Sequence, residues 1–273
     1  MSTLLHMSDP HFGTERPAAV EALLRLAEQQ QPDLVVLSGD ITQRARRRQF
    51  AAARRFVEQL DRPLLAIPGN HDIPLFNLLV RWLAPFSGYR RCFGDDLEPI
   101  VDRDDLLVIG VNTARPERHE DGEVDTRQVD RVAIRLAKAT PGQLRIVVTH
   151  QPIHVTEGAD RKNLLIGGEH AARRWATAGA DLILGGHIHL PFVRPLRERY
   201  ADLDRDVWVV QAGTALSERV REGGNNSVFL IRHDASTRCQ VEQWDHRLGA
   251  ACFERVATTP LLLDRPSPPA RAA

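Results

Sequence analysis

Short, continuous apolar runs recur through the first two thirds of this chain, and longer segments with a helical period separate them. An apolar run without polar alternation is typical of a strand that is covered on both faces. The predicted strands are Leu4–Met7, Leu34–Leu37, Leu64–Ile67, Leu106–Val111, Arg145–Thr149 and Leu182–Leu184. The predicted helices are Pro17–Gln30, Arg46–Leu60, Leu75–Leu83, Thr126–Ala139 and Glu169–Ala178. This alternation predicts βαβ units around a largely parallel sheet, which is an α/β fold.

The pattern changes after Leu190, where short strand-like runs follow one another without helical segments between them. The predicted strands are Val207–Gln211, Ser227–Arg232, Cys239–Asp245 and Ala251–Ala257. We expect these C-terminal strands, 207–257, to complete a second, more antiparallel sheet that packs against the first. Residues 1–263 are therefore predicted to form a single domain, and the Pro- and Ala-rich tail 264–273 to be disordered.

Charge and cysteine content narrow the classes of partner and compartment. The 36 basic and 36 acidic residues balance to a formal net charge of +0, so nucleic acid is not expected as the main partner. The cysteines Cys92, Cys239 and Cys252 form no CxxC pair and indicate neither a disulfide framework nor a thiolate zinc site. No apolar run approaches the roughly 18 residues that a membrane span needs. We expect a cytoplasmic protein without a membrane span.

Side chains of the metal-ligand type follow five of the predicted strands, close to the point where each strand ends. They are Asp9, His11, Asp40, Asn70, His71, His150, His187 and His189. Because the carboxyl ends of parallel strands meet at one edge of a sheet, we expect these side chains to lie together. They are numerous enough to hold two divalent metal ions. Such ions about 3.5–4 Å apart are the usual arrangement for displacement at phosphorus, so the chain is predicted to cleave a phosphoester.

Each of these short motifs is ambiguous by itself. The alternation of an extended segment puts Asp9 and His11 on one side of the chain, where both can chelate one ion. His187 and His189 can do the same or divide between two ions. A lone motif of this kind is more often structural. The dipeptide Gly39-Asp40 is also a common turn. The joint occurrence of all five motifs at strand ends is what favours the functional interpretation.

The motifs occur in the order D-x-H, G-D, G-N-H-D, H and G-H-x-H. In this sequence they read Ser8-Asp9-Pro10-His11, Ser38-Gly39-Asp40, Gly69-Asn70-His71-Asp72, Thr149-His150-Gln151-Pro152 and Gly185-Gly186-His187-Ile188-His189. With them the chain resembles the calcineurin-like metallophosphoesterases over residues 3–195. The resemblance implies the fold of that family, which is a four-layer αββα sandwich of two mixed sheets flanked by helices.

The resemblance also implies a role for each motif residue. The first metal would be held by Asp9, His11 and His189, and the second by Asn70, His150 and His187. Asp40 would bridge the two metals through its two carboxylate oxygens. His71 would not bind metal but would point at the phosphate, where it stabilises charge or protonates the leaving oxygen, with Asp72 to orient it. His71 and Asp40 are therefore the predicted catalytic residues.

The mixed nitrogen and oxygen ligands suit transition metals better than calcium. The resemblance favours two metal ions, which are Mn²⁺ and/or iron (Fe²⁺ or Fe³⁺). Zn²⁺ or Co²⁺ would also fit these ligands. Such ions make a water competent to attack phosphorus near neutral pH. His71 would supply the proton that the leaving oxygen needs.

The spacing of the motifs leaves no room for a large inserted cap, and it resembles the compact bacterial branch of the family. That branch includes the class III cyclic-nucleotide phosphodiesterases and the glycerophosphodiesterases, and it favours a homodimer. We therefore predict a phosphodiesterase for a small phosphodiester such as a cyclic nucleotide. The alternative is a UDP-diacylglucosamine-type or other nucleotide pyrophosphatase. A nuclease is disfavoured by the neutral charge, and a non-catalytic scaffold by the retention of His71 and all seven ligands.

Two segments outside the motifs are candidates for substrate contacts. The loop after Leu106–Val111 should reach the same sheet edge, which makes Asn112, Arg115 and His119 the predicted substrate-binding residues. Solvated loop positions are an equal alternative for all three. The apolar segment 75–93 is assigned to the core or to a dimer contact, with an apolar lip beside the site as the alternative.

Overall fold

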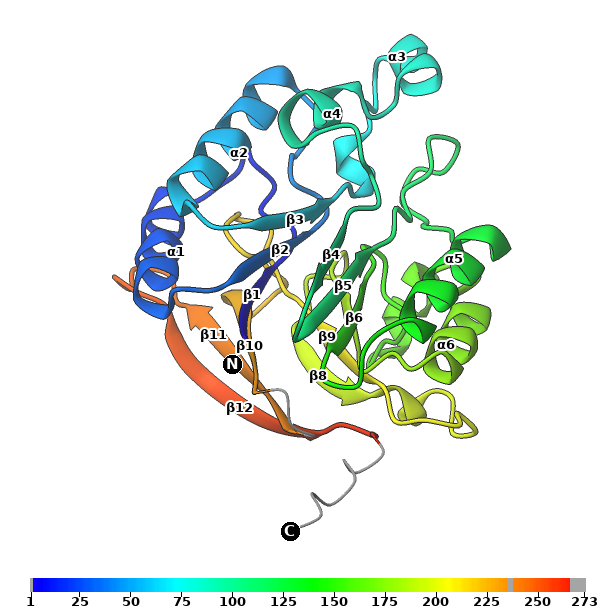
Figure 1. Cartoon of the computed structure of the whole chain (residues 1–273). Helices are drawn as coiled ribbons and strands as arrows, with labels where there is room; N and C mark the ends of the chain where they lie inside the picture. Colours follow the sequence, from blue (N-terminus) through cyan, green and yellow to red (C-terminus); the bar gives the residue numbers. More distant parts are fainter. Residues whose placement is uncertain (1, 235–237, 266–273) are drawn as a thin grey trace.

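The structure, a computed structural model, describes residues 2–234 and 238–265 and contains two six-stranded sheets that pack face to face (Figure 1). The first sheet contains, in spatial order, β12 (Glu254–Leu262), β11 (Arg238–His246), β10 (Asn226–His233), β1 (Ser2–Met7), β2 (Leu34–Ser38) and β3 (Leu64–Ile67). The second contains β4 (Ile100–Arg103), β5 (Leu106–Gly110), β6 (Leu144–Val148), β7 (Leu182–Gly185), β9 (Trp208–Gln211) and β8 (Phe192–Pro195). Of the tail predicted to be disordered, residues 266–273 lie outside the described residues.

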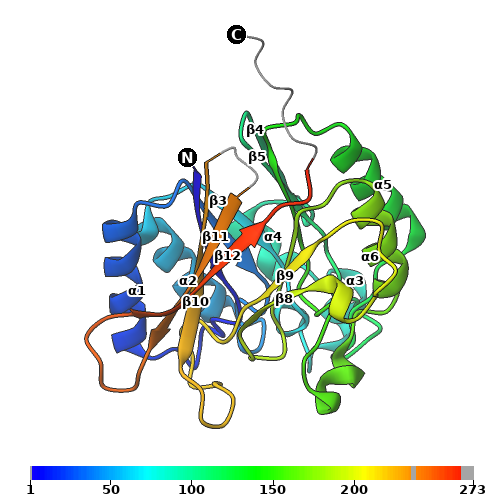
Figure 2. The same cartoon turned by 90° about the horizontal axis from the view of Figure 1, so that it is seen from below.

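Helices cover the outer face of each sheet. The longer ones are α1 (Pro17–Gln30), α2 (Arg47–Leu60), α5 (Thr126–Ala137) and α6 (Gly168–Thr177), and the shorter ones are α3 (Leu78–Leu83) and α4 (Ser87–Phe93). Short 3₁₀ helices are η1 (Asn70–Asp72), η2 (Gly158–Asn163) and η3 (Leu196–Glu198). Figure 2 shows α1 and α2 on one side of the paired sheets and α5 and α6 on the other. The predicted α/β sandwich of two mixed sheets flanked by helices is confirmed.

Successive side chains of the inner strands enter different cores, which is why these strands are apolar at every position. Leu4 and Val36 pack between the sheets against Val108 and Ile146 of the second sheet. Leu5, next to Leu4, packs on the other face with residues of α1 and α2. The α5 and α6 side of the second sheet has its own core. Each strand therefore buries both faces, as its continuous apolar run predicts.

Local sequence explains where the main helices begin. Pro17 occupies the first turn of α1, where its missing N–H would have no helical partner. Asp125 caps α5 by accepting a hydrogen bond from Gln128 N at 2.8 Å, and the Gln128 side chain accepts one from Asp125 N at 3.2 Å. Among the described residues, none of the helices has the length and apolar content to cross a bilayer.

The division of strands between the sheets corrects two predictions. The strands of the first two thirds do not share one parallel sheet, because β1, β2 and β3 are neighbours in the first sheet and β5, β6 and β7 are neighbours in the second. The C-terminal strands divide too: β9 pairs with β7, whereas β10 pairs antiparallel with β1 and is followed outward by β11 and β12. A strand that is apolar on both faces looks the same whether helices or a second sheet cover it, so the pattern could not separate these arrangements.

Candidate metal centre

The candidate centre lies where the carboxyl ends of strands from both sheets meet. The loop after β1 carries Asp9 and His11, the loop after β2 carries Asp40, and η1 after β3 carries Asn70 and His71. From the second sheet, β6 leads to His150 and β7 leads to His187 and His189. The structure brings all eight predicted motif residues to this one place. The two sheets therefore present their carboxyl edges to a common site.

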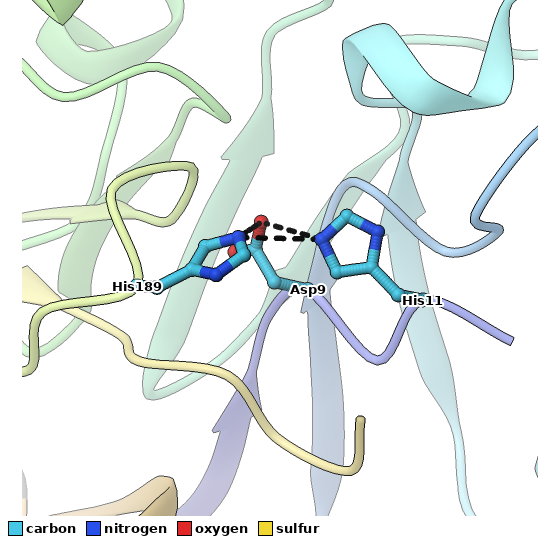
Figure 3. A group of neighbouring side chains, drawn as sticks. All are labelled: Asp9, His11 and His189. Atoms are coloured by element: carbon cyan, nitrogen blue, oxygen red, sulfur yellow. Dashed lines mark hydrogen bonds and ion pairs between the residues drawn. The ribbon is translucent and has the colours of Figure 1, made fainter. Parts of the chain in front are cut away.

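One group of side chains consists of Asp9, His11 and His189, which Figure 3 shows converging from two loops. The Nε2 atoms of His11 and His189 are 3.3 Å apart. They lie 3.6 and 3.2 Å from Asp9 Oδ1, which is buried and has no hydrogen bond among the described residues. Two imidazole nitrogens and an oxygen directed at one point fit a cation between them, so the donors of this group suit a transition metal.

A second group consists of Asp40, His150 and His187, with Asn70 beside it. His150 Nε2 lies 3.2 Å from Asp40 Oδ1 and 3.2 Å from Asn70 Oδ1. The other oxygen, Asp40 Oδ2, lies 3.8 Å from His11 Nε2 of the first group. Asp40 therefore contacts both groups with different oxygens, which is the geometry that a bridging carboxylate requires.

The backbone at the centre adopts conformations that ordinary residues rarely take. Asp9, His11, Asp40, His187 and His189 all have positive φ, with angles of 52°, 43°, 48°, 73° and 57°. Such backbone positions carry strain and cluster at functional sites, where the surrounding structure maintains them. Close packing adds a second constraint: a Cβ at the glycine before Asp40, which has φ 98°, would come within 2.5 Å of the His150 ring.

Backbone carbonyls fix the orientation of two imidazole rings. His150 Nδ1 lies 2.8 Å from the Ser38 carbonyl oxygen, and His189 Nδ1 lies 2.5 Å from the Arg219 carbonyl oxygen. An Nδ1–H that donates to a carbonyl leaves the Nε2 lone pair free and directs it inward. This arrangement is the usual support for a metal-binding histidine.

The pKa values of the site residues are shifted because the residues are buried and carboxylates pack against imidazoles. Burial alone would raise the pKa of Asp40, but His150 and His71 hold the pKa of that carboxyl well below its usual range. Burial lowers the pKa of His11 to about 4 and that of His187 to about 3. Burial also opposes a charge on His150, yet the Asp40 carboxylate raises its pKa to about 9. At neutral pH the centre therefore holds an ionised Asp40 together with neutral His11 and His187, which can bind cations.

His71 lies at the mouth of this centre. Its backbone N–H donates to Asp40 Oδ1 at 2.8 Å, and its Nδ1 lies 2.8 Å from the Gln43 carbonyl oxygen. The expectation that Asp72 orients His71 is wrong. Asp72 instead accepts hydrogen bonds from Gly69 N, Ile41 N, Thr42 N and Thr42 Oγ1, because the turn of η1 directs its buried carboxylate towards the loop after β2. Asp72 therefore joins two of the motif loops.

The three predicted substrate-binding residues differ in whether they lie at the candidate centre. His119 lines a small cavity together with His71, Asn70 and Gln43. Asn112 and Arg115 do not line this cavity, because their side chains bind neighbouring residues of their own loop and, for Arg115, also Gln128 of α5. The Asn112 amide oxygen accepts from Ala114 N at 3.2 Å, and the Arg115 guanidinium donates to the carbonyl oxygens of Asn112 and Ala114. The structure thus brings only His119 to the mouth of the centre.

The two helices of segment 75–93 differ in the burial of their apolar side chains. The apolar side chains Phe86 and Tyr89, in and just before α4, are buried in the core beneath α2, as the core assignment predicts. In contrast, the apolar side chains in and just before α3 are 63–78% exposed: Phe76, Leu78, Leu79, Trp82 and Leu83. The reason is that α3 stands away from both sheets at the rim of the molecule (Figure 1). The core assignment is therefore wrong for α3.

Sequence reasoning missed one side chain at the centre, that of Arg219. Its Nη1 atom lies 3.1 Å from His71 Nε2 and 3.3 Å from Gln43 Oε1. Arg219 follows the last motif by 30 residues, in the loop between β9 and β10. No short-range spacing connects it to the motifs, so only the return of this loop to the centre reveals it.

Comparison with known proteins places the chain in a family. A family model described as calcineurin-like phosphoesterase matches residues 2–191, which include all the motif residues. The chain belongs to the calcineurin-like phosphoesterase family. The resemblance inferred from the five motifs is therefore confirmed.

Three curated relatives share less than 30% sequence identity with this chain. A probable cyclic nucleotide phosphodiesterase of Synechococcus is 29% identical over 66% of this chain and 66% of its own length. A protein of the same name from Rhodococcus erythropolis is 26% identical over 68% of this chain and 64% of its own length. A probable glycerophosphodiester phosphodiesterase of Arcobacter nitrofigilis is 26% identical over 58% and 57%. The chain thus matches between 57% and 66% of the length of these relatives.

Solved structures support the fold. Purple acid phosphatase from yellow lupin (Lupinus luteus) seeds superposes with a TM-score of 0.69 at 12% identity, covering 96% of this chain and 54% of the other. A dimetal phosphatase from Danio rerio superposes with a TM-score of 0.65 at 12% identity, covering 96% and 99%. Identities this low establish a shared fold and nothing finer.

Proposed function

We propose that this protein is a metal-dependent phosphodiesterase with a dinuclear centre. The observation that carries the proposal is the pair of ligand groups that share Asp40. Asp9, His11 and His189 would hold one ion, and His150, His187 and Asn70 the other. The donor set of carboxylate, amide and imidazole fits Mn²⁺ or iron, and also Zn²⁺ or Co²⁺.

Two bound cations would attract the phosphate oxygens and lower the pKa of a water for attack on phosphorus. The protein side chains then manage orientation and protons. His71 faces the centre through Nε2, because Nδ1 is held by the Gln43 carbonyl oxygen. The water gives up a proton to solvent, its oxygen bonds to phosphorus as the P–O ester bond breaks, and a proton from His71 Nε2 can pass to the leaving oxygen.

A small phosphodiester such as a cyclic nucleotide is the proposed substrate. Support comes from the names of the relatives, two probable cyclic nucleotide phosphodiesterases and one probable glycerophosphodiester phosphodiesterase.

One observation favours a second candidate, a pyrophosphatase for a nucleotide-linked lipid. The cavity at His71 shares Arg44 and Leu75 with a larger groove of about 490 Å³. That groove is lined by basic side chains and by Phe76 and Val80, next to the exposed apolar side chains of α3. An anionic head group with an apolar chain would match this surface. The same apolar side chains support the homodimer as a proposal, since exposed apolar patches often mark contacts between proteins.

A hydrolysis screen with added Mn²⁺ tests these proposals. The substrates are bis-p-nitrophenyl phosphate, p-nitrophenyl phosphate, cyclic AMP and a UDP-linked lipid, with Asp40→Ala as the inactive control. Faster cleavage of the diester than of the monoester is expected. Preference for the monoester would contradict a phosphodiesterase, preference for the UDP-linked lipid would favour the pyrophosphatase, and inactivity with bound metal would favour a scaffold.

A further inference from the structure

The loop between β9 and β10 returns to the candidate centre and is held there by backbone hydrogen bonds. Ala215 N donates to the Ser8 carbonyl oxygen at 2.9 Å, directly before Asp9, and Glu218 N donates to the Thr14 carbonyl oxygen at 3.0 Å. These bonds tie the loop to the segment that carries the first motif. The half-buried side chain of Arg219 is thereby directed at the mouth of the centre.

Two arginines of this loop differ in how their charge is balanced. Arg221 forms ion pairs with Asp160 at 2.7 Å and Glu157 at 2.5 Å, away from the centre. For Arg219, no carboxylate among the described residues lies within the 4.0 Å of an ion pair. Among the described residues, its guanidinium has hydrogen-bond contacts with His71 and with the amide oxygen of Gln43. A guanidinium that is partly desolvated and lacks an anion is suited to bind one.

The donors of Arg219 and His71 converge on one point. Since His71 Nδ1 is held by the Gln43 carbonyl oxygen, Nε2 is the ring atom that faces outward, and Arg219 Nη1 lies 3.1 Å from it. The guanidinium carries hydrogens on Nη1 and cannot accept a hydrogen bond, so it still offers donors to an oxyanion in front of His71. A phosphate oxygen is such an acceptor, and guanidinium groups bind phosphate with two parallel hydrogen bonds.

We propose that Arg219 binds a non-bridging oxygen of the substrate phosphate, beside His71. This assignment rests on the proposed phosphodiesterase function and adds a binding residue from outside the motifs. Because negative charge is spread over the phosphate oxygens during displacement, a positioned guanidinium stabilises the transition state as well as bound phosphate.

The backbone and side chain of Arg219 have separate tasks, which makes the proposal testable. The carbonyl oxygen accepts hydrogen bonds from His189 Nδ1 at 2.5 Å and from Thr214 Oγ1 at 2.7 Å. Arg219→Ala keeps this carbonyl and removes only the guanidinium. Metal content should therefore be unchanged in Arg219→Ala. Loss of metal would mean that the residue acts through His189, and it would overturn the proposal.

Kinetics provide the main test. With Mn²⁺ and bis-p-nitrophenyl phosphate, Arg219→Ala should lower kcat/KM by about 10²–10³-fold, the usual cost of one transition-state donor. Arg219→Lys should recover part of the loss, because it restores the charge without the planar fork. Arg221→Ala, from the same loop, should leave kcat/KM unchanged. Added guanidinium ion should partly restore Arg219→Ala but not His71→Ala. Equal kcat/KM for Arg219→Ala and the wild type would refute the proposal.

Binding of inorganic phosphate to the Mn²⁺-loaded protein separates this inference from the proposed function. Calorimetry should find phosphate bound at least tenfold more weakly by Arg219→Ala than by the wild type or Arg221→Ala, since a charge-assisted hydrogen bond is lost. If the wild type binds phosphate in this manner but cleaves no ester, the phosphodiesterase proposal fails and the Arg219 assignment stands. If the wild type is active and phosphate binds equally to both proteins, only the Arg219 assignment fails. If the wild type binds no phosphate, the Arg219 assignment fails, and hydrolysis of the diester alone decides the phosphodiesterase proposal.

Discussion

The loops that carry the motifs and the segments around them use their polar and apolar side chains in opposite ways. In the motif loops, Asp9, His11 and His150 are fully buried, and their side chains point into the two ligand groups. Around them, the apolar side chains of α3 are exposed, and the Arg115 guanidinium binds its own loop and Gln128 of α5. Polar groups are thus buried where the chemistry is proposed, and apolar groups are exposed at the rim.

This difference has a physical cause. Buried polar groups without hydrogen-bond partners are costly, so a chain retains them only where something else balances them. Asp9 Oδ1 and the strained backbone of five motif residues are such costs, and bound cations would balance them. The exposed apolar side chains of α3 carry no such cost of buried polar groups. We infer that the motif loops set the reaction and that the rim sets the substrate.

The largest expected effect comes from Asp40, which contacts both ligand groups. Asp40→Ala removes the proposed bridge, so metal content and phosphodiesterase activity should fall together to background. Metal analysis and hydrolysis of bis-p-nitrophenyl phosphate measure this. The matched control is Asp130→Ala, which removes an exposed carboxylate in an ion pair with Arg174 and should keep both properties. Activity retained by Asp40→Ala would remove the basis for a shared centre.

The next largest effect is expected for His71. This residue lies at the centre but is not one of the proposed metal ligands. His71→Ala should lower kcat by about 10²–10⁴-fold, as expected for the loss of a general acid, with both metals retained. His170→Ala, on the exposed side of α6, is the control and should be neutral. Because His71 also lies near His11 and Asp40, metal analysis decides between a proton donor and a ligand. Loss of a metal ion in His71→Ala would make it a ligand.

A smaller effect is expected from pH. The pKa of His150 is about 9, so at pH 7 its ring carries a proton that a metal ion must displace. Apparent metal affinity should therefore rise with pH, by about tenfold per unit for each proton released, and level off above pH 9. Calorimetry of Mn²⁺ binding at pH 7 in two buffers of different ionisation enthalpy counts these protons. Equal heats in both buffers would show that none is released.

The smallest effect is expected at the rim. Trp82 is 63% exposed, so Trp82→Ala should change the free energy of unfolding by no more than about 0.5 kcal/mol. Phe86→Ala, a buried aromatic four residues later, should cost about 3 kcal/mol. Chemical denaturation compares the two variants. A large loss of stability in Trp82→Ala, or a shift in its size-exclusion elution, would mean that α3 is covered by a second copy in solution.

Much of the fold and of the centre could be predicted because the signals are local. The strands that precede the ligands, β1, β2, β3, β6 and β7, span four to six mostly apolar residues, and each ligand follows one of them within a few positions. Helix starts are equally local, as at Pro17 and Asp125. The assignment of strands to sheets was not predictable from these runs, since β3 and β5 have the same apolar character but lie in different sheets.

The sequence by itself determined the family and the residues of the centre, because the motif side chains must stand at strand ends wherever those strands lie. Only the tertiary structure decided which sheet each strand joins, that Asp72 binds the loop after β2, and that α3 exposes its apolar side chains. It also decided the position of Arg219. Contacts between residues far apart in the chain depend on how the layers pack, and this packing leaves no periodic signal in the sequence.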